Sequence, residues 1–510
     1  MRAALLVGVR FLAPTPAEPY LHTSVAIRPH HVCESPMREH WSSRIGFILA
    51  TAGFSVGLGN IWRFPYLAGE NGGGAFLLVY VVYAILIGIP LMTAEITLGR
   101  TSQLTPVAGM GRLTGSKTSP WNLIGWFGIA SAVLITSYYI MVIAWMTAYF
   151  VVLVGGGNMG QTPDETRAAF DGFISTPGPV FGYALLVTFL VAFVVSRGVA
   201  RGIERYAKFL MPLLVVILLA LAVRAMTLPG AGAGFLWYLT PDFSALRPAS
   251  YLAALGQAFF SIGIGMAAAF GLGSYLDRRD SDVPGNAAMV VAFDTGVAVV
   301  AGLVLFPALF AFGMNPDQGA GLLFITMTSL FQQMPGGAVF GAAFFFLMII
   351  AGFTSQVALF EILVASLADS RGMSRGKAVL ACAVGSFVVG IPVILSQGPW
   401  SDIHIFGMNF FDFADTVSSD YMLAAGGLLI SLYIVSQWGW KRFREEANRG
   451  AGRVQASAAW RFLFRFVIPV AVAIVLLGGF GVGAGNPPVF LGCAAAIIVV
   501  YAVLLRRFPA

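Results

Sequence analysis

Charged residues are scarce in this sequence of 510 residues. Lys, Arg, Asp and Glu together make up 10%, against 58% hydrophobic residues. Soluble domains carry about 25% charged residues, so the composition argues against a soluble globular protein. It is typical of a polytopic α-helical membrane protein. The net charge of +7 does not indicate nucleic-acid binding, because the basic residues lie in alternate short loops between apolar segments.

Cysteine and histidine are also rare, with three Cys and five His. Cys33, Cys382 and Cys493 are scattered and suggest neither a disulfide framework nor a metal centre. No histidine lies in the middle of an apolar segment, and the sequence has no His-Glu-x-x-His, phosphate-binding loop or paired-cysteine motif. We therefore expect no enzyme activity.

Long runs of apolar residues make up most of the sequence. A helix needs about 20 apolar residues to cross a bilayer, so we predict an all-α membrane protein with twelve transmembrane helices. They are expected at residues 44–69, 74–98, 121–155, 177–196, 204–226, 251–276, 285–313, 338–369, 376–396, 409–437, 461–482 and 488–505.

Arg and Lys residues concentrate in the loops after the even-numbered spans. The positive-inside rule then predicts that both termini are cytoplasmic, in a multi-pass protein of the plasma (inner) membrane. Residues 1–36 contain no clear signal-peptide cleavage site. We expect this segment to be a disordered extension, or to precede a true start at Met37.

One short phrase occurs twice. Residues 55–60 and 261–266 both read Ser-aliphatic-Gly-aliphatic-Gly, in the first and sixth predicted spans. Glycine is a poor helix former, and paired interruptions in two halves of a membrane protein point to a binding site between inverted repeats. We predict a five-plus-five inverted repeat over residues 37–250 and 251–440, with the last two spans in 441–510. The alternative is that these glycines only allow close helix packing.

Polar residues within the apolar segments are the candidate site residues. Free carbonyls at a helix break coordinate a cation, and free amides attract a carboxylate. Asn60 offers an oxygen at the first break, and Asp294 is an acid inside an apolar span, which is costly and usually functional. Asp294 fits a hard cation, but also a water pocket or a proton relay.

Other polar positions are more ambiguous when taken alone. The adjacent hydroxyls of Thr354 and Ser355 are also explained by bonds to their own helix backbone, and Tyr138 and Tyr139 by a membrane-interface belt. Arg63, just after the first break, needs a partner within the membrane, and Asp415 is the candidate.

Three motifs resemble the neurotransmitter:sodium symporter family. They are Arg38-Glu39-His40-Trp41, Gly57-Leu58-Gly59-Asn60-Ile61-Trp62-Arg63-Phe64-Pro65 and Glu70-Asn71-Gly72-Gly73-Gly74-Ala75-Phe76. The resemblance runs from about Met37 to the C-terminus. It implies a fold like that of the bacterial leucine transporter, in which helices 1 and 6 are broken. The resemblance and the repeat inferred above therefore lead to the same fold and do not count as two independent lines of support.

The resemblance implies roles for the matching positions. Residues implied to contact the substrate are Phe54, Gly57, Gly59, Ile135, Tyr139, Phe260, Ser261, Gly263, Ile264, Gly265, Met266, Thr354 and Leu359. Residues implied to hold a first Na⁺ are Ser55, Asn60, Ser261 and Asp294, and those for a second Na⁺ are Gly53, Val56, Ala351, Thr354 and Ser355.

Gates are implied on both sides of this site. Arg63 and Asp415 would form the outer gate, with Phe260 as a lid over the substrate. Arg38 and Asp369 would latch the cytoplasmic side beside Trp41 and Tyr275. Gly202, nine further residues and Pro212 match the device in the fifth span that unwinds during inward release.

The implied substrate pocket has no charge apart from the ion site, so it favours neutral, hydrophobic L-amino acids from branched aliphatic to aromatic. Animal members of the family usually have Asn at the seventh-span position and need chloride, whereas Asp294 carries its own negative charge. We therefore expect two Na⁺ ions and no chloride requirement. Alternatives are a same-fold symporter for another small solute, and a sodium-dependent receptor that does not transport. The oligomeric state is not predicted.

Overall fold

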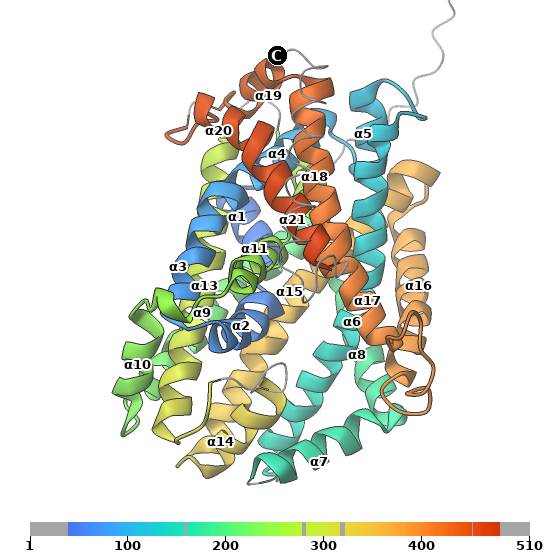
Figure 1. The fold of residues 1–510 in the computed structure, drawn as a ribbon. Helices are drawn as coiled ribbons and strands as arrows, with labels where there is room; N and C mark the ends of the chain where they lie inside the picture. Colours follow the sequence, from blue (N-terminus) through green and yellow to red (C-terminus); the bar gives the residue numbers. More distant parts are fainter. Residues whose placement is uncertain are drawn as a thin grey trace, which may run out of the picture. The chain divides into compact units, whose positions relative to one another are not determined.

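A computed structural model describes residues 39–157, 160, 162–277, 282–316, 322–450 and 452–479. Helices form all the regular structure in these ranges, apart from one isolated bridge between Ile405 and Met408. Figure 1 shows the long helices running side by side. Residues 1–36, Arg38 and the predicted twelfth span at 488–505 lie outside the described ranges.

Within the described ranges, nine continuous helical segments are long and apolar enough to cross a membrane. The first three are Gly74–Ser102 (α3, Gly74–Tyr83; η2, Ala84–Gly88; α4, Ile89–Ser102), Pro120–Val154 (η3, Pro120–Asn122; α6, Leu123–Val154) and Pro177–Ser196 (α8). The next four are Val199–Met226 (η4, Val199–Glu204; α9, Arg205–Met226), Val283–Ala311 (α13), Gly337–Arg371 (α15) and Arg375–Leu395 (α16). The last two are Phe410–Trp438 (α17, Phe410–Asp415; η8, Thr416–Met422; α18, Leu423–Tyr433; η9, Ile434–Trp438) and Ala458–Leu477 (α20, Ala458–Phe462; η10, Leu463–Val467; and part of α21, Ile468–Gly479). Shorter helices connect them: α5 (Pro106–Thr114), α7 (Pro163–Ile174), α10 (Ala231–Leu239), η5 (Phe243–Ala245), η7 (Leu323–Met327), α14 (Thr328–Gln333) and α19 (Trp440–Ala447).

The first predicted span is bent where the sequence phrase predicts a break. Helix α1 (Arg44–Ser55) ends because Val56 is extended, with φ −70° and ψ 99°. The chain resumes as η1 (Gly59–Arg63) and α2 (Phe64–Glu70), bent by 52° from α1. This bent pair is the tenth candidate span.

The sixth predicted span is two short helices, α11 (Pro248–Ile262) and α12 (Ala268–Gly273), each too short to cross a bilayer. Between them, Gly263 and Gly265 have φ of +73° and +88°. At Gly265 an added Cβ would lie 1.9 Å from the carbonyl oxygen of Leu423. Only glycine fits this position, so the second phrase also marks a real interruption.

The broken helices lie among the buried helices. Helix α1 packs against α9, α13 and α15, while α11 packs against α3 and α12 against α4. In Figure 1, α1, α11 and α15 are close to the centre of the drawing. Helices α8, α9 and α16 instead expose large apolar side chains, including Phe189, Phe209 and Leu380. Exposed apolar surface of this kind suits contact with lipid.

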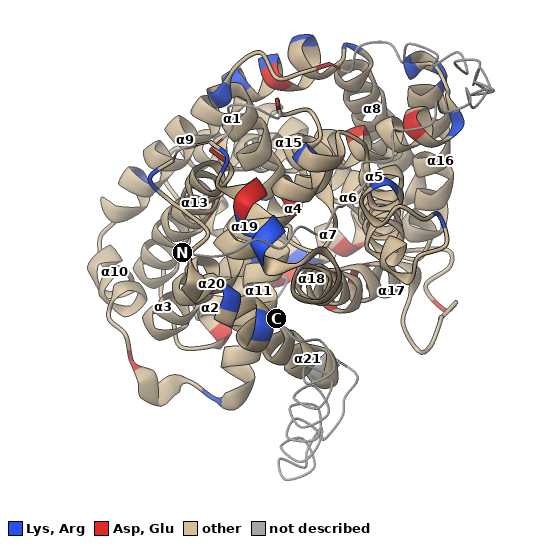
Figure 2. Ribbon diagram, turned by 90° about the horizontal axis from the view of Figure 1, so that it is seen from above, with Lys and Arg blue, Asp and Glu red and all other residues tan. Residues whose placement is uncertain are grey.

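Basic residues mark one end of the helices. Figure 2 looks onto the end that carries α19 and shows Lys and Arg on α19 and near α16. These segments follow the tenth and eighth predicted spans, whose loops are the ones that the positive-inside rule places in the cytoplasm.

Candidate binding site at the two helix breaks

The two breaks meet at a cluster of buried polar groups. Asn60, from η1, donates from Nδ2 to Ser261 Oγ at 2.9 Å and to Asp294 Oδ1 at 2.8 Å. Ser261, from the last turn of α11, donates to Asp294 Oδ2 at 2.9 Å. Asp294 is fully buried in α13. Three helices far apart in the sequence therefore converge on one carboxylate, and three of the four residues predicted for the first Na⁺ lie together there.

Ser55, the fourth of these residues, lies beside the cluster. Its Oγ bonds to the carbonyls of Ile262 at 3.1 Å and Thr51 at 3.3 Å. No ion pair with Asp294 is present among the described residues, so neutral donors alone surround its charge. A buried carboxylate without a cationic partner is costly. The hydroxyl and carboxylate oxygens here form a ligand set that suits a hard monovalent cation.

Two residues of this cluster were missed from the sequence. Tyr80 donates to Ser261 Oγ at 3.2 Å and to Asp294 Oδ2 at 3.3 Å. Gln257 donates from Nε2 to the Gly59 carbonyl at 2.7 Å. Tyr80 lies in a long apolar run and gives no sequence signal. Gln257 is a polar residue one turn before Ser261, so helical periodicity would have placed it on the same face.

A second set of oxygens surrounds Ser355 on α15. Its Oγ lies 3.3, 2.8, 3.4 and 3.2 Å from the carbonyl oxygens of Gly53, Phe54, Val56 and Ala351. Three of these carbonyls belong to the frayed end of α1. A cluster of carbonyl oxygens with one hydroxyl also suits a hard cation. Thr354 bonds only to carbonyls of its own helix, at 3.0 and 3.1 Å.

A small cavity of about 30 Å³ lies between the breaks. Its predicted lining residues are Phe54, Gly59, Ile135, Tyr139, Phe260, Gly263, Met266 and Leu359, and they are joined by Ser55 and Ser355. The other predicted contacts, Gly57, Ser261, Ile264, Gly265 and Thr354, do not line it. The volume is that of about one water molecule, so an amino acid enters only if the surrounding helices or side chains move.

Backbone amides at the first break face this region. Leu58 N donates to the Tyr139 hydroxyl at 3.0 Å, and Gly57 N donates to Asn60 Oδ1 at 3.0 Å. A Cβ at Gly57 would lie 2.6 Å from the Tyr139 hydroxyl. The close approach of Tyr139 therefore depends on glycine. Tyr138, the ambiguous neighbour, points instead to Ser419, at 3.3 Å between the hydroxyls.

In this structure the ion pair of Arg63 is with an acid other than the predicted Asp415. Arg63 Nη2 pairs with Asp420 Oδ1 at 3.1 Å, whereas Asp415 accepts from Ser419 Oγ at 2.8 Å. Asp420 lies in η8 (Thr416–Met422), a π-helical segment that begins directly after Asp415. This segment bonds residues five apart, a register that a regular α-helix does not have. The Arg63 guanidinium also lies 4.6 Å from the centre of the Phe260 ring, so it touches the predicted lid.

The predicted inner latch is described only in part, because Arg38 lies outside the described ranges. Asp369 accepts from Thr105 N at 2.8 Å. Trp41 and Tyr275 do lie together, with ring centroids 6.3 Å apart. Trp41 Nε1 also donates to the carbonyl of Leu272 at 3.0 Å, which ties the segment before α1 to the end of the α12 region.

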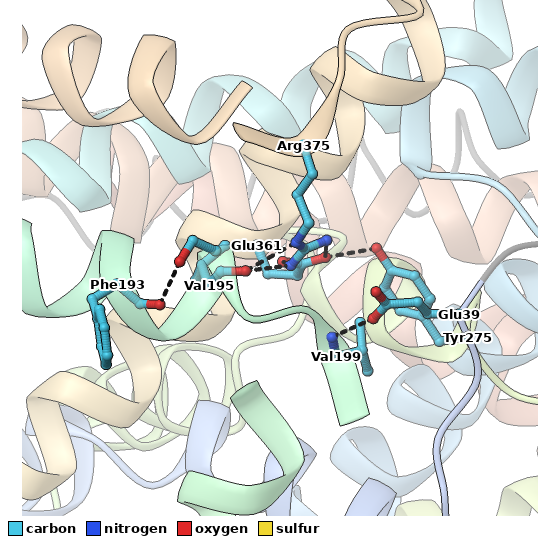
Figure 3. Close-up of polar contacts among 8 residues, drawn as sticks. Glu39, Phe193, Val195, Val199, Tyr275, Glu361 and Arg375 are labelled. Carbon is cyan, nitrogen blue, oxygen red and sulfur yellow. Dashed lines mark hydrogen bonds and ion pairs between the residues drawn. The ribbon is translucent and has the colours of Figure 1, made fainter. Parts of the chain in front are cut away.

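Figure 3 shows a further inner cluster that the sequence analysis missed. Glu361, buried in α15, accepts from the Tyr275 hydroxyl at 2.7 Å and pairs with Arg375 at the start of α16. Arg375 Nε also donates to the Val195 carbonyl at 2.9 Å. The signal was available, because Glu361 is an acid inside an apolar span, the same feature that singled out Asp294.

Glu95, an acid within the second span, pairs with backbone. Its Oε1 accepts from Gly265 N at 2.7 Å. The carboxylate therefore satisfies an amide freed by the break in the sixth span, which supports the interrupted backbone there.

Comparison with known proteins places this geometry in a family. The sequence profile described as “Sodium:neurotransmitter symporter family” matches residues 38–155 and 170–482. The “Uncharacterized sodium-dependent transporter YhdH” of Bacillus subtilis (strain 168) is 38% identical over 443 residues, which cover 87% of this chain and 98% of that protein. The human “Sodium- and chloride-dependent creatine transporter 1” is 30% identical over 429 residues, covering 71% of this chain and 66% of that protein.

A solved structure is similar over most of the chain. The crystal structure of MhsT in complex with L-phenylalanine matches with a TM-score of 0.79 and 40% sequence identity. The match covers 87% of this chain and 100% of that one. The two proteins therefore share their fold over most of this chain.

Proposed function

Because this chain belongs to the sodium:neurotransmitter symporter family, we propose that it imports neutral, hydrophobic L-amino acids together with two Na⁺ ions. The family consists of transporters, and the chain is a sodium-dependent symporter with several membrane-spanning helices. The observation that carries the proposal is the junction of both helix breaks at Asn60, Ser261 and the buried carboxylate of Asp294.

The substrate class rests on the lining of the central cavity. Apolar and aromatic side chains dominate it, and none of its lining residues is charged. Such a pocket cannot compensate a charged substrate side chain. The amides near Gly57 and the hydroxyl of Tyr139 would receive the substrate carboxylate in exchange for the bonds that they form within the protein in this structure. The structure of MhsT in complex with L-phenylalanine is consistent with a pocket of this kind.

The first Na⁺ would be held by Ser55, Asn60, Ser261 and Asp294. Asp294 has only neutral donors around it in the described residues, so a bound cation would neutralise a charge that is otherwise costly to bury. With this negative charge supplied by the protein, transport needs no chloride. The substrate carboxylate would complete the same ion site, which makes Na⁺ and substrate binding mutually favourable.

The second Na⁺ would be held by oxygens of Gly53, Val56, Ala351, Thr354 and Ser355. The carbonyls of α1 and α15 that converge on Ser355 support four of these residues, namely Gly53, Val56, Ala351 and Ser355 itself. Thr354, whose hydroxyl bonds to its own helix, would have to turn towards the site. Two Na⁺ ions crossing 100 mV release about 4.6 kcal/mol, enough for accumulation on the order of 10³-fold even without a sodium gradient.

The transport cycle we propose is alternating access in a five-plus-five inverted repeat with cytoplasmic termini. Spans 1, 2, 6 and 7 would move against the rest, with Arg63 and Phe260 closing the outer side and the Trp41–Tyr275 region closing the inner side. The small volume of the central cavity supports this scheme, because the helices around it must move to admit a substrate.

The test is uptake of radiolabelled leucine and tryptophan into proteoliposomes with an inward Na⁺ or K⁺ gradient in chloride-free buffer. We expect accumulation of at least one amino acid with Na⁺ and none with K⁺. Sodium-dependent binding without accumulation would instead favour a receptor that does not transport. The absence of both binding and uptake would contradict the substrate class.

A further inference from the structure

A second cavity, which shares no lining residue with the central one, lies at the junction of the fourth and fifth predicted spans. It has a volume of about 690 Å³ and is formed by residues between Ser196 and Lys208. This volume lies within the range of small-molecule sites, roughly 300–1,000 Å³. Neither the ion sites nor the gates use it.

The charge of this cavity is strongly positive. Arg197, Arg201, Arg205 and Lys208 line it together with one carboxylate, Glu204. Glu204 is already engaged, because it pairs with Lys208 at 2.6 Å and accepts from Ser42 N at 2.8 Å. Its charge is therefore balanced by Lys208 and not by an ion pair with any of the three arginines.

The three arginines are available to a ligand. All are exposed, and among the described residues Arg201 and Arg205 form no side-chain hydrogen bond or ion pair. Arg197 contacts only the ring of Phe193, with its guanidinium 4.6 Å from the ring centre. The other nearby acid, Glu39, is held by the Val199 amide at 2.5 Å. Guanidinium groups bind phosphate oxygens in bidentate pairs.

The surroundings of the cavity distinguish between sources of phosphate. Phe193, one turn before Arg197, is 38% exposed, and Phe209, next to Lys208, is 66% exposed. Further apolar side chains continue along the same helices, including Phe189 on α8 and Val216 on α9. The basic cavity thus lies at the end of two apolar faces that suit acyl chains. Basic pockets between membrane helices are known to bind acidic lipid headgroups.

We propose that this cavity binds the phosphate headgroup of an anionic membrane lipid, with its acyl chains along α8 and α9. Arg197, Arg201 and Arg205 bind the phosphate, while the rings of Phe193 and Phe209 contact the chains. The site includes η4 (Val199–Glu204), the first turn of the fifth span, so an occupied site also braces the segment that contains Gly202.

The test is native mass spectrometry of the full-length protein with equimolar phosphatidylglycerol and phosphatidylcholine. The site variant is R197Q/R201Q/R205Q. The matched control K441Q/R444Q/R453Q removes the same charge from exposed positions outside the cavity. Each basic residue near a bilayer surface contributes about 1 kcal/mol, so the site variant should bind phosphatidylglycerol on the order of 10- to 100-fold more weakly. Sodium-dependent thermal stability checks that all variants are folded.

The proposal predicts that phosphatidylglycerol is retained in preference to phosphatidylcholine, and that only the site variant loses this preference. Equal loss in both variants, or no loss in either, would overturn it. A third arm adds 10 mM inorganic phosphate. Retention should be unchanged, because the acyl chains contribute to binding; full displacement by phosphate would show a site for a soluble anion and overturn the lipid assignment.

Discussion

At the scale of single residues, Ser355 joins the two halves of the proposed second ion site. Its hydroxyl touches carbonyls of both α1 and α15. Removing a hydroxyl of this kind costs about 1–1.5 kcal/mol, which corresponds to roughly tenfold in affinity. We expect Ser355→Ala to raise the half-saturating Na⁺ concentration for uptake on the order of tenfold.

The control for this change is Ser131→Ala, another buried serine whose hydroxyl bonds only to its own helix, at Phe127. It should leave the sodium dependence of uptake unchanged. An unaltered sodium curve for Ser355→Ala would contradict the assignment of this serine.

The outer ion pair predicts different effects on transport for two neighbouring acids, Asp415 and Asp420. Arg63 pairs with Asp420, and both side chains are partly exposed, so the pair contributes about 0.2–1 kcal/mol. We expect Asp420→Asn to raise the KM for external substrate by up to about fivefold, because Arg63 is then held less firmly over Phe260. Asp415→Asn, which removes a bond to Ser419, should have the smaller effect in uptake kinetics. The reverse order would restore the pairing predicted from the sequence.

At the scale of elements, the break in the sixth span depends on a backbone that only glycine adopts. Gly265 has φ +88° and no room for a Cβ beside Leu423. We expect Gly265→Ala to destabilise the protein by at least 1–3 kcal/mol and to abolish transport. Thermal melting in detergent measures the first effect.

A matched glycine lies in the neighbouring helix. Gly296 is in the middle of α13, and an added Cβ there meets nothing within 4 Å. Gly296→Ala should be neutral or stabilise the helix by up to about 1 kcal/mol. If both variants melted at the same temperature, the positive φ of Gly265 would not be a requirement for stability.

The inner cluster links elements that meet only in the folded chain. Arg375 at the start of α16 neutralises the buried Glu361 of α15. Removing one member of such a pair leaves a buried charge and costs about 3–5 kcal/mol. We expect Arg375→Gln to lower the melting temperature more than the double variant Glu361→Gln/Arg375→Gln. Additive effects of the two single changes would show that the residues are not coupled.

The elements also show which features a sequence reveals. Both helix breaks were predictable, because Ser-aliphatic-Gly-aliphatic-Gly is a local pattern with a local backbone consequence. The partner of Arg63 in this structure was not predictable, because Asp420 lies in the π-helical segment Thr416–Met422, whose geometry leaves no mark on composition. Tyr80 was missed for a different reason. An aromatic residue in an apolar run is typical of a buried core, and only the structure shows that its hydroxyl donates to Asp294.

At the scale of the whole molecule, the family and its class of transport follow from sequence motifs, whereas the volume of the central cavity does not. That volume depends on how closely Phe260, Tyr139 and Met266 pack, which is a property of several helices at once. The same holds for the basic cavity near Arg201, whose residues gave only a charge count in the sequence. Sequence motifs thus locate a site, whereas the packing of several helices determines the volume of its cavity.

We propose that Asp294 supplies the negative charge that makes transport independent of chloride. The most direct measurement compares amino-acid uptake by wild type and Asp294→Asn in proteoliposomes, with gluconate or chloride as the anion. Asp164→Asn, which removes an exposed acid from α7, is the control.

We expect wild type and Asp164→Asn to transport equally well in both buffers. Asp294→Asn should lose uptake on the order of tenfold or more in gluconate, because its ion site then lacks a negative charge, and should recover it in chloride. Unchanged uptake by Asp294→Asn without chloride, or a chloride requirement in wild type, would contradict the account.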